Sequence, residues 1–381
     1  MTDRQRTCIG YFVPPSPHFA GVERVVHEIA TGLAEEHADV LDVHVFFATR
    51  YDDRLLVKPS YNLHVLDVDR LRKVASSLRS AVATNEIDIL VCAQVEPSVI
   101  AWLATRGLGL TGFVAHLHGN PRLEERNGTL RTRVAFSLFR NVISRRVSGV
   151  LAVAPSLQKY AAQSLSRHAP VVFARNPARF LGDGETGPRP RTGEFRLLNV
   201  GRLDRQKGQD VLLRALAIAR PSLPPTRLTI VGSGPDEPAL RELSRHLGLS
   251  DIVDFPGYLP DPATHFGNAD CFVLSSRWEG FPLVLLEALR FGLPILAADC
   301  DFGPRDLVTD PRIGDLVPVE DAAALADGLV RAASRVSDAD AEAFRRRVAS
   351  AYGRSEATAS HFDALWQILS TRDLAVLRPG I

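Results

Sequence analysis

Two glutamates in the last third of the chain have the types and the spacing for sugar or phosphate chemistry. Glu279 lies in a turn closed by Gly280, and Glu287 follows about two helical turns later. Pro282 suits the first position of a helix, because its missing N–H would be unpaired there in any case. A helix that begins directly after the strand predicted for 271–274 presents unpaired N–H groups, which bind anions such as phosphate. A carboxylate beside such a site can accept hydrogen bonds from paired sugar hydroxyls.

Two cations follow an earlier strand, predicted for 197–200. Arg202 and Lys207 lie on one turn, and Lys207 is the only lysine after Lys159 in a chain that otherwise uses arginine. A single lysine suggests a site that needs a compact point charge. The alternative for both motifs is ordinary, namely a charged turn and two solvated glutamates. The apolar neighbours of Glu287 argue against that alternative.

Together these motifs resemble those of a known family. The stretch from Glu279 to Leu289 resembles the Glu-x7-Glu motif of retaining GT-B glycosyltransferases of family 4, and the stretch from Gly201 to Gly208 is similar to that family's Gly-Arg-Leu-x-x-x-Lys-Gly segment. The resemblance implies an α/β fold of two doubly wound Rossmann-like domains that face each other across a cleft. It also implies a nucleotide-sugar donor.

The resemblance assigns roles to the residues of both motifs. Arg202 and Lys207 would hold the donor diphosphate, Glu279 would contact the donor sugar hydroxyls as a catalytic residue, and Glu287 would accept from the ribose hydroxyls. The rest of the turn would complete the donor site: Gly280, Phe281, Pro282 and Leu283.

Three further positions match the family more loosely. His118 follows the strand predicted for 112–117, where the family has a catalytic histidine near the reacting carbon; His116 competes with it but falls within the strand. Gly21 matches a loop glycine that approaches the diphosphate, although the family usually has two glycines there. Tyr258 could stack on the nucleotide base, and a surface tyrosine is the equal alternative.

No metal and no cofactor is expected. Asp299-Cys300-Asp301 resembles a metal-binding Asp-x-Asp pair, but residues 302–306 look like the family's loop after the glutamate helix. The resemblance implies that no metal is needed, because cationic side chains and a helix end neutralise the leaving diphosphate. The four cysteines contain no CxxC pair, and their spacing suits neither a zinc site nor a disulfide framework. They are Cys8, Cys92, Cys271 and Cys300.

Strands alternate with helices along the chain, which predicts parallel sheets. The loop after the first strand, 14–21, lacks GxGxxG and so lacks the dinucleotide fingerprint. The predicted strands lie at 8–13, 43–47, 87–92, 112–117, 149–153, 171–174, 197–200, 228–231, 252–255, 271–274, 295–297 and 315–317. The predicted domains are an N-terminal acceptor-binding domain over 1–177, a linker over 178–194, a C-terminal nucleotide-sugar domain over 195–354, and a helix over 355–381 that the resemblance returns to the first domain.

Composition narrows the class of protein. The 381 residues suggest two or three domains of ~150 residues, and a net charge of +1 gives no field for nucleic acid. Residues 1–7 are polar and no long apolar stretch follows, so we expect no signal peptide, no membrane span and a cytoplasmic location. An arginine-rich amphipathic helix over 129–147 is interpreted as a packed helix with a solvated face. Its predicted apolar stripe consists of Val134, Ala135, Leu138, Phe139, Val142 and Ile143. The alternative is peripheral contact with anionic lipid on the inner face of the cell membrane.

The resemblance implies a metal-independent retaining transferase in cell-surface polysaccharide synthesis. Residues 303–308, Gly-Pro-Arg-Asp-Leu-Val, resemble members that use UDP-hexoses or UDP-N-acetylhexosamines, with GDP-mannose as the second choice of donor. The implied acceptor is a glycan or a polyprenyl-diphosphate-linked saccharide. A UDP-sugar epimerase on the same fold is an alternative, and an NAD-linked oxidoreductase is a weaker one because the fingerprint is absent.

Overall fold

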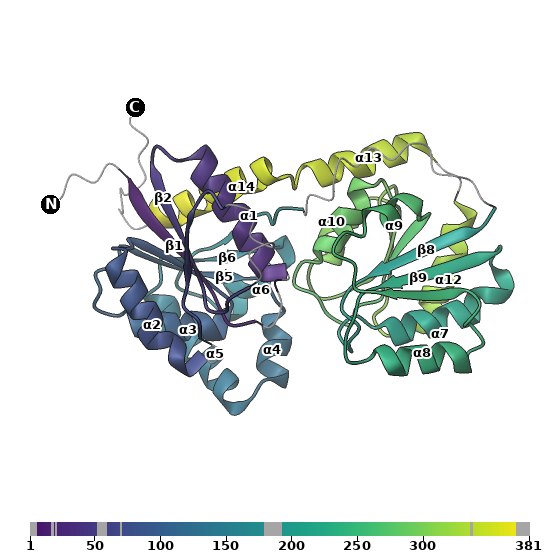
Figure 1. Cartoon of the computed structure of the whole chain (residues 1–381), viewed down its shortest axis with the longest axis horizontal. Helices are drawn as coiled ribbons and strands as arrows, with labels where there is room; N and C mark the ends of the chain where they lie inside the picture. The colour runs from purple at the N-terminus through teal and green to yellow at the C-terminus, as the bar shows by residue number, and fades with distance from the viewer. Residues whose placement is uncertain are drawn as a thin grey trace. The chain divides into compact units, whose positions relative to one another are not determined.

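The computed structural model describes residues 6–16, 19, 21–51, 59–68, 71–178, 193–335 and 338–370, without the side chains of 71 and 72. The chain divides into two compact units. The first unit contains the described residues up to Pro177 together with those from Arg354 onward, and the second unit runs from Ala178 to Gly353. Most of the predicted linker lies outside the described residues. Each unit is a parallel sheet with helices on its faces (Figure 1).

The first unit is built on a seven-stranded parallel sheet with strand order β3-β2-β1-β4-β5-β6-β7. Its strands are β1 (Thr7–Val13), β2 (Leu41–Phe47), β3 (Asn62–Val65), β4 (Ile89–Ala93), β5 (Gly112–Leu117), β6 (Gly149–Ala152) and β7 (Val171–Phe173). Its helices are α1 (Gly21–Glu36), α2 (Leu71–Thr84), α3 (Val95–Thr105), α4 (Pro121–Asn127), α5 (Leu130–Asn141), α6 (Pro155–Ser164) and α14 (Arg354–Ser370).

The second unit is built on a six-stranded parallel sheet with strand order β10-β9-β8-β11-β12-β13. Its strands are β8 (Phe195–Val200), β9 (Thr226–Val231), β10 (Val253–Gly257), β11 (Cys271–Leu274), β12 (Ile295–Ala298) and β13 (Gly314–Val317). Its helices are α7 (Gln209–Ala219), α8 (Glu237–His246), α9 (Ala263–Asn268), α10 (Leu283–Arg290), α11 (Pro304–Leu307), α12 (Ala322–Ser334) and α13 (Ala339–Ser350).

Continuous apolar runs explain the central strands. Every residue of β1, β4, β5 and β11 is buried, as expected for strands covered by helices on both faces. The edge strand β3 was not predicted, because its residues Asn62–Val65 are partly exposed and lack that apolar signal. Alternating strands and helices, and the two parallel sheets that they predict, are confirmed.

Helix α14 packs onto the first unit although it follows the whole second unit in sequence. Two glycines allow the close approach: a Cβ at Gly32 would overlap Thr358, and a Cβ at Gly149 would overlap Ile368. The predicted C-terminal helix is therefore present from Arg354 to Ser370, and residues 371–381 lie outside the described residues.

The arginine-rich helix differs from its prediction. It ends at Asn141, because Val142 leaves the helical conformation and a short 3-10 turn, η2 (Ile143–Arg145), follows. Its buried stripe consists of Ala135, Phe136 and Phe139, and Ile143 of η2 is buried after it. The prediction placed Val134 and Val142 in that stripe and was wrong, because the bulky aromatic rings take the buried face and leave these valines 57% and 42% exposed.

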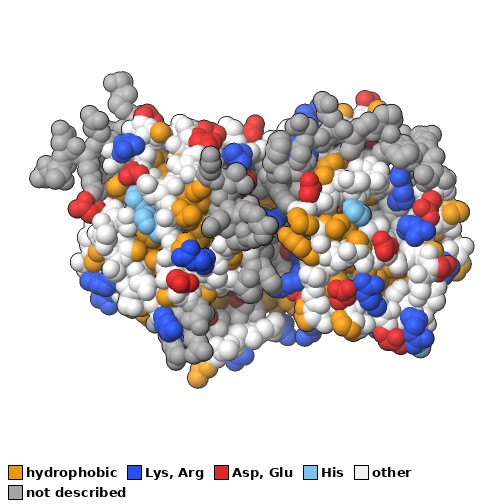
Figure 2. Space-filling view, in the orientation of Figure 1, with side chains coloured by type: hydrophobic (Ala, Val, Ile, Leu, Met, Phe, Trp, Pro, Cys, Tyr) orange, Lys and Arg blue, Asp and Glu red, His pale blue; other side chains and the backbone are white. Residues whose placement is uncertain are grey.

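Charges of both signs occur on the face of the molecule that Figure 2 draws. On the face drawn in Figure 2, basic and acidic side chains alternate and do not gather into one region of a single sign. Among the described residues, no helix combines the length and the apolar character that crossing a membrane requires.

Candidate functional site

The turn between β11 and the first residue of α10 holds five of the eleven predicted site residues, Glu279 to Leu283. Gly280, Phe281 and Pro282 are buried, and Leu283 is half-buried. Helix α10 begins at Leu283, so Pro282 is the N-cap and not the first helical residue as predicted. Its ψ of 96° is extended, which delays the helix by one residue. Gly303, at φ 89°, lies against the turn, and a Cβ there would overlap Pro282.

Glu279 is buried in this turn and is bound by two donors. Its exposed fraction is 5%, and its Oε1 accepts hydrogen bonds from Lys207 Nζ and from Ser276 Oγ, each at 2.6 Å. A buried carboxylate is stable only when it is paired and hydrogen-bonded, and these two contacts supply both conditions. The structure therefore brings together Glu279 and Lys207, which the sequence predicted separately.

The loop after β8 holds Lys207 against that turn. Gly208 takes the left-handed conformation at φ 63°, where a Cβ would overlap the carbonyl of Ser275. Ser275 Oγ donates to the Lys207 carbonyl at 3.0 Å, and Gln206 Nε2 donates to the Trp278 carbonyl at 3.0 Å. Side chains and backbone thus join the two loops on both sides of the Lys207–Glu279 pair.

Arg277 also joins this turn to neighbouring segments through ion pairs, and the sequence analysis did not predict this role. Its guanidinium donates to both carboxylate oxygens of Asp210, at 2.9 and 2.8 Å, and to Glu320 at 2.6 Å. The hydrogen bonds to Asp210 are the main cause that raises the pKa of Arg277. Its position two residues before Glu279 was the available signal, because a cation inside the motif needs its own acid partners.

The remaining residues that were predicted to bind the nucleotide-sugar donor have different surroundings. Glu287 is buried on α10, with an exposed fraction of 8%. Arg202 is exposed and pairs with Asp204. Tyr258 follows the end of β10 and is 59% exposed. Phe281 stacks on Tyr352, with ring centroids 5.6 Å apart.

The segment Asp299-Cys300-Asp301, which resembles a metal-binding Asp-x-Asp pair, has a structural role. Asp299 pairs with Arg305 at 3.0 Å, and Cys300 Sγ donates to the Ser276 carbonyl at 3.1 Å. The segment therefore supports the turn that carries Ser276 and Glu279. Burial raises the pKa of the Cys300 thiol, which keeps it protonated and able to donate.

In the first unit, the end of β5 carries a cluster of rings. The ring centroids of His116 and His118 are 3.9 Å apart, and those of His116 and His361 are 5.2 Å apart; Tyr11 lies 5.7 Å from His361. Both ring nitrogens of His116 and the Nε2 atoms of His118 and His361 are buried without a hydrogen-bond partner among the described residues. Burial lowers the pKa of His118 and of His361 to about 3, so both are neutral at pH 7.

Helix α4, directly after His118, adds two residues that the sequence did not predict. Asn120 caps the helix through its Oδ1, which accepts from the Leu123 N–H at 3.1 Å, while its Nδ2 is buried without a partner among the described residues. The Glu124 carboxylate lies so close to Gly119 that a Cβ there would overlap it. Burial, with the nearby Glu96 charge, raises the pKa of Glu124 to about 7. The predicted Gly21 is the exposed first residue of α1.

Comparison with known proteins decides the family. The model of Glycosyltransferase Family 4 matches residues 19–177, and the model of Glycosyl transferases group 1 matches residues 187–344. The chain belongs to the family 4, group 1 glycosyltransferases. The structure of Anabaena HepE in complex with UDP and glucose is similar, with a TM-score of 0.75 and 20% identity over 95% of this chain and 100% of that one. This likeness shows the GT-B fold.

Two relatives of this glycosyltransferase have more specific names. It is 39% identical over 145 residues to the phosphatidyl-myo-inositol mannosyltransferase of Mycobacterium leprae, a match that spans 37% of each chain. It is 32% identical over 133 residues to the N-acetylgalactosamine-N,N'-diacetylbacillosaminyl-diphospho-undecaprenol 4-alpha-N-acetylgalactosaminyltransferase of Campylobacter jejuni, over 35% of this chain and 36% of the relative. The chain thus matches little more than a third of the length of either relative.

Proposed function

We propose that this glycosyltransferase moves a hexosyl or N-acetylhexosaminyl group from a UDP-sugar to a glycan or a lipid-linked saccharide, with retention of configuration. The buried Lys207–Glu279 pair with Ser276 carries this proposal. It lies where β8 and β11 end, and ligands of doubly wound sheets bind at the carboxyl ends of strands. A cation and an acceptor at one point suit a donor that has a diphosphate next to a sugar.

Each residue has a role in the proposed donor site. Lys207 neutralises the diphosphate, with Arg202 as a second, exposed cation. Glu279 accepts from the sugar hydroxyls, and Glu287 accepts from the ribose hydroxyls. Gly280, Phe281, Pro282 and Leu283 bring the first N–H groups of α10 toward the diphosphate, and Tyr258 contacts the base.

The proposed reaction is a front-face displacement. The acceptor oxygen bonds to the anomeric carbon on the face from which the diphosphate leaves, and the acceptor proton passes to a diphosphate oxygen. No enzyme nucleophile is needed. His118, neutral at pH 7, offers a hydrogen bond to the sugar without placing a charge beside the reacting carbon. The negative charge of the diphosphate is met by Lys207 and the helix end, so no metal is needed in the proposal.

The choice of UDP rests on similarity. The Anabaena HepE structure holds UDP and glucose, and residues 303–308 resemble members that use UDP-sugars. GDP-mannose is the second candidate, supported by the mannosyltransferase name of the Mycobacterium relative. A thermal-shift screen of UDP-glucose, UDP-N-acetylglucosamine, UDP-N-acetylgalactosamine and GDP-mannose separates them. Stabilisation by GDP-mannose alone would replace the UDP proposal.

An exposed row on α5 supports a lipid-linked acceptor at a membrane surface. Leu130 and Val134 are 78% and 57% exposed and lie one helical turn apart, with Arg131 and Arg133 beside them. Apolar side chains flanked by arginines bind the interface of anionic bilayers. Flotation with phosphatidylglycerol vesicles should recover the wild type and lose Val134→Glu. The neutral vesicles of phosphatidylcholine are the control.

The enzyme class is tested by product analysis. Incubation with the preferred donor and a polyprenyl-diphosphate disaccharide should yield one added sugar, and the coupling constant of its anomeric proton should show the configuration of the donor. A product of inverted configuration would remove the retaining mechanism. Conversion of the UDP-sugar without any acceptor would favour the epimerase instead.

A further inference from the structure

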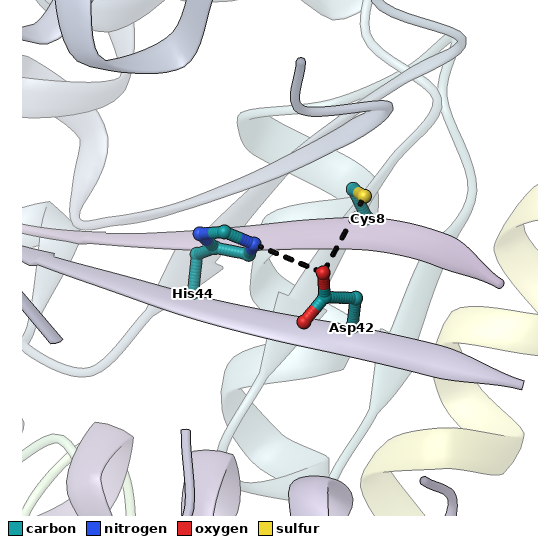
Figure 3. Close-up of side chains that lie close together, drawn as sticks. All are labelled: Cys8, Asp42 and His44. Atoms are coloured by element: carbon teal, nitrogen blue, oxygen red, sulfur yellow. Dashed lines mark hydrogen bonds and ion pairs between the residues drawn. The ribbon is translucent and has the colours of Figure 1, made fainter. Parts of the chain in front are cut away.

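A second group of reactive side chains lies on strands β1 and β2 of the first sheet, away from the carboxyl ends of the strands. Cys8 and Asp42 are register partners on the neighbouring strands β1 and β2, and His44 lies two residues after Asp42 on the same face. Figure 3 shows the three side chains pointing toward one another. Cys8 and His44 are buried, and Asp42 is half-buried. Cys8 and Asp42 are the second residues of their strands and His44 is in the middle of β2, whereas His118 follows the carboxyl end of β5.

The three ligand atoms have the spacing of an open metal site. The Cys8 Sγ lies 4.0 Å and the His44 Nε2 lies 3.5 Å from the Asp42 Oδ2, and all three atoms are within 4.8 Å of one another. Ligand atoms around a tetrahedral zinc ion lie roughly 3.3–3.6 Å apart, from bond lengths of about 2.0–2.3 Å. The Nε2–Oδ2 distance is too long for a good hydrogen bond. An ion would draw the atoms together by small side-chain rotations.

Neighbouring side chains on β3 orient these ligands. His44 Nδ1 and His64 Nε2 are 3.0 Å apart, and when His44 donates this hydrogen bond its Nε2 keeps a lone pair for the metal. Asn62 Nδ2 donates to the Asp42 Oδ1 at 2.8 Å, which leaves Oδ2 on the side of Cys8. Asn62 Nδ2 also lies 3.4 Å from the His44 Nε2, a weak contact that the metal would replace.

We propose that Cys8, Asp42 and His44 bind a zinc ion, with water as the fourth ligand on the half-exposed side of Asp42. A thiolate with an imidazole favours zinc over the hard ions magnesium and calcium, which prefer oxygen ligands. Because the site joins β1 to β2 away from the carboxyl ends of the strands, the ion stabilises the first unit and takes no part in glycosyl transfer. The spacing of the cysteines alone gave no sign of this site, since its other ligands come from the next strand.

Cobalt titration of the full, untagged, metal-stripped protein tests the proposal. The wild type should bind one equivalent of Co²⁺ with a thiolate-to-cobalt charge-transfer band, and Zn²⁺ should displace the cobalt. Cys8→Ala should lose the band and weaken binding at least a hundredfold. Cys92→Ala, a buried cysteine on β4 of the same sheet, is the matched control and should bind as the wild type does. His64→Gln should weaken binding about tenfold, as expected for a residue that orients a ligand.

Two further measurements test the zinc site independently of the Cys8→Ala titration. Zn²⁺ should raise the Tm of the wild type and of Cys92→Ala but not that of Cys8→Ala. If Cys8→Ala does not fold, Asp42→Asn at the half-exposed ligand should fold and show the same loss of binding. Substoichiometric cobalt binding by the wild type, or equal affinity in Cys8→Ala, would overturn the zinc site.

Discussion

The two units prepare their sites in opposite ways. In the second unit, the charged Lys207 and Glu279 are already paired, and Ser276 completes their hydrogen bonds. In the first unit, the cluster at the end of β5 is neutral, and ring nitrogens of His116 and His118 are buried without partners among the described residues. One site holds satisfied charges, and the other holds unsatisfied neutral groups.

This difference indicates how each unit is prepared to bind a ligand. A fixed ion pair offers a preorganised field to a charged ligand, at little cost of reorganisation when the ligand arrives. A buried polar atom without a partner costs about 1–3 kcal/mol, and a ligand or water that supplies the partner recovers it. These properties support the proposal of a diphosphate at the site of the second unit and of hydroxyl groups, which can both donate and accept, at the site of the first.

Breaking the ion pair should give the largest effect. Lys207→Ala should lower kcat/KM for the donor about ten- to a hundredfold, because a hydrogen bond to a charged group contributes roughly 1.5–3 kcal/mol. It should also destabilise the second unit, since Glu279 remains buried and charged, a change that costs about 3–5 kcal/mol. The double variant Lys207→Met/Glu279→Gln should regain stability but not activity. Kinetics and urea unfolding measure the two effects.

A surface ion pair of the same unit is the matched control for that experiment. Arg305→Ala removes the half-exposed partner of Asp299 and should change neither measurement by more than about 1 kcal/mol. An unchanged kcat/KM in Lys207→Ala would remove this lysine from the donor site.

Substitutions of Glu279 and Glu287 should have different effects on kcat and on the affinity for the nucleotide diphosphate. Glu279→Gln should lower kcat about tenfold or more and leave affinity for the nucleotide diphosphate nearly unchanged, because contacts to the sugar strengthen as positive charge develops on it. Glu287→Ala should weaken that affinity about tenfold, since the ribose is present in substrate and product alike. Calorimetric titration with UDP, together with kcat, measures both. The reversed pattern would exchange the two roles.

Local patterns predicted the fold well, and the site only in part. The apolar run that predicted β11 is a short-range signal, and so is the spacing of Glu279 and Glu287. The contact of Lys207 with Glu279 joins residues 72 positions apart, and spacing carries no information about it. His361 reaches the histidine cluster from α14, at the far end of the chain, so no pattern around His118 could reveal it.

The neutral cluster predicts that acid weakens the first unit. The folded pKa of His118 and of His361 is about 3, below the ~6.5 of an unfolded histidine. The unfolded chain therefore binds more protons below pH ~6.5, and stability is complete above that pH and falls toward pH 3. Each buried histidine contributes at most about 1.4 kcal/mol per pH unit in this window. Glu124, with a pKa of about 7, acts in the opposite direction between pH ~4.5 and 7.

A difference between variants isolates the histidine contribution. His361→Gln should reduce the proton uptake on unfolding by about a quarter of a proton at pH 7 and by about one proton at pH 5, and the Glu124 contribution cancels in the comparison. The exposed His168 of the same unit gives the control variant His168→Gln, which should keep the wild-type pH dependence. Equal pH dependence in all three proteins would show that His361 is protonated in the fold.

Chelation should have the smallest effect on turnover, namely none. The proposed transfer reaction uses no metal, because Lys207 and the N-terminus of α10 are proposed to neutralise the diphosphate, and Asp299 is already paired with Arg305. EDTA should leave kcat unchanged and lower only the Tm, because it would strip zinc from Cys8, Asp42 and His44. Turnover that is lost in EDTA and restored by Mn²⁺ would show that Asp299 and Asp301 hold a metal after all. Asp299→Asn separates these outcomes, since it would then abolish the Mn²⁺ response but otherwise leave turnover as in the wild type.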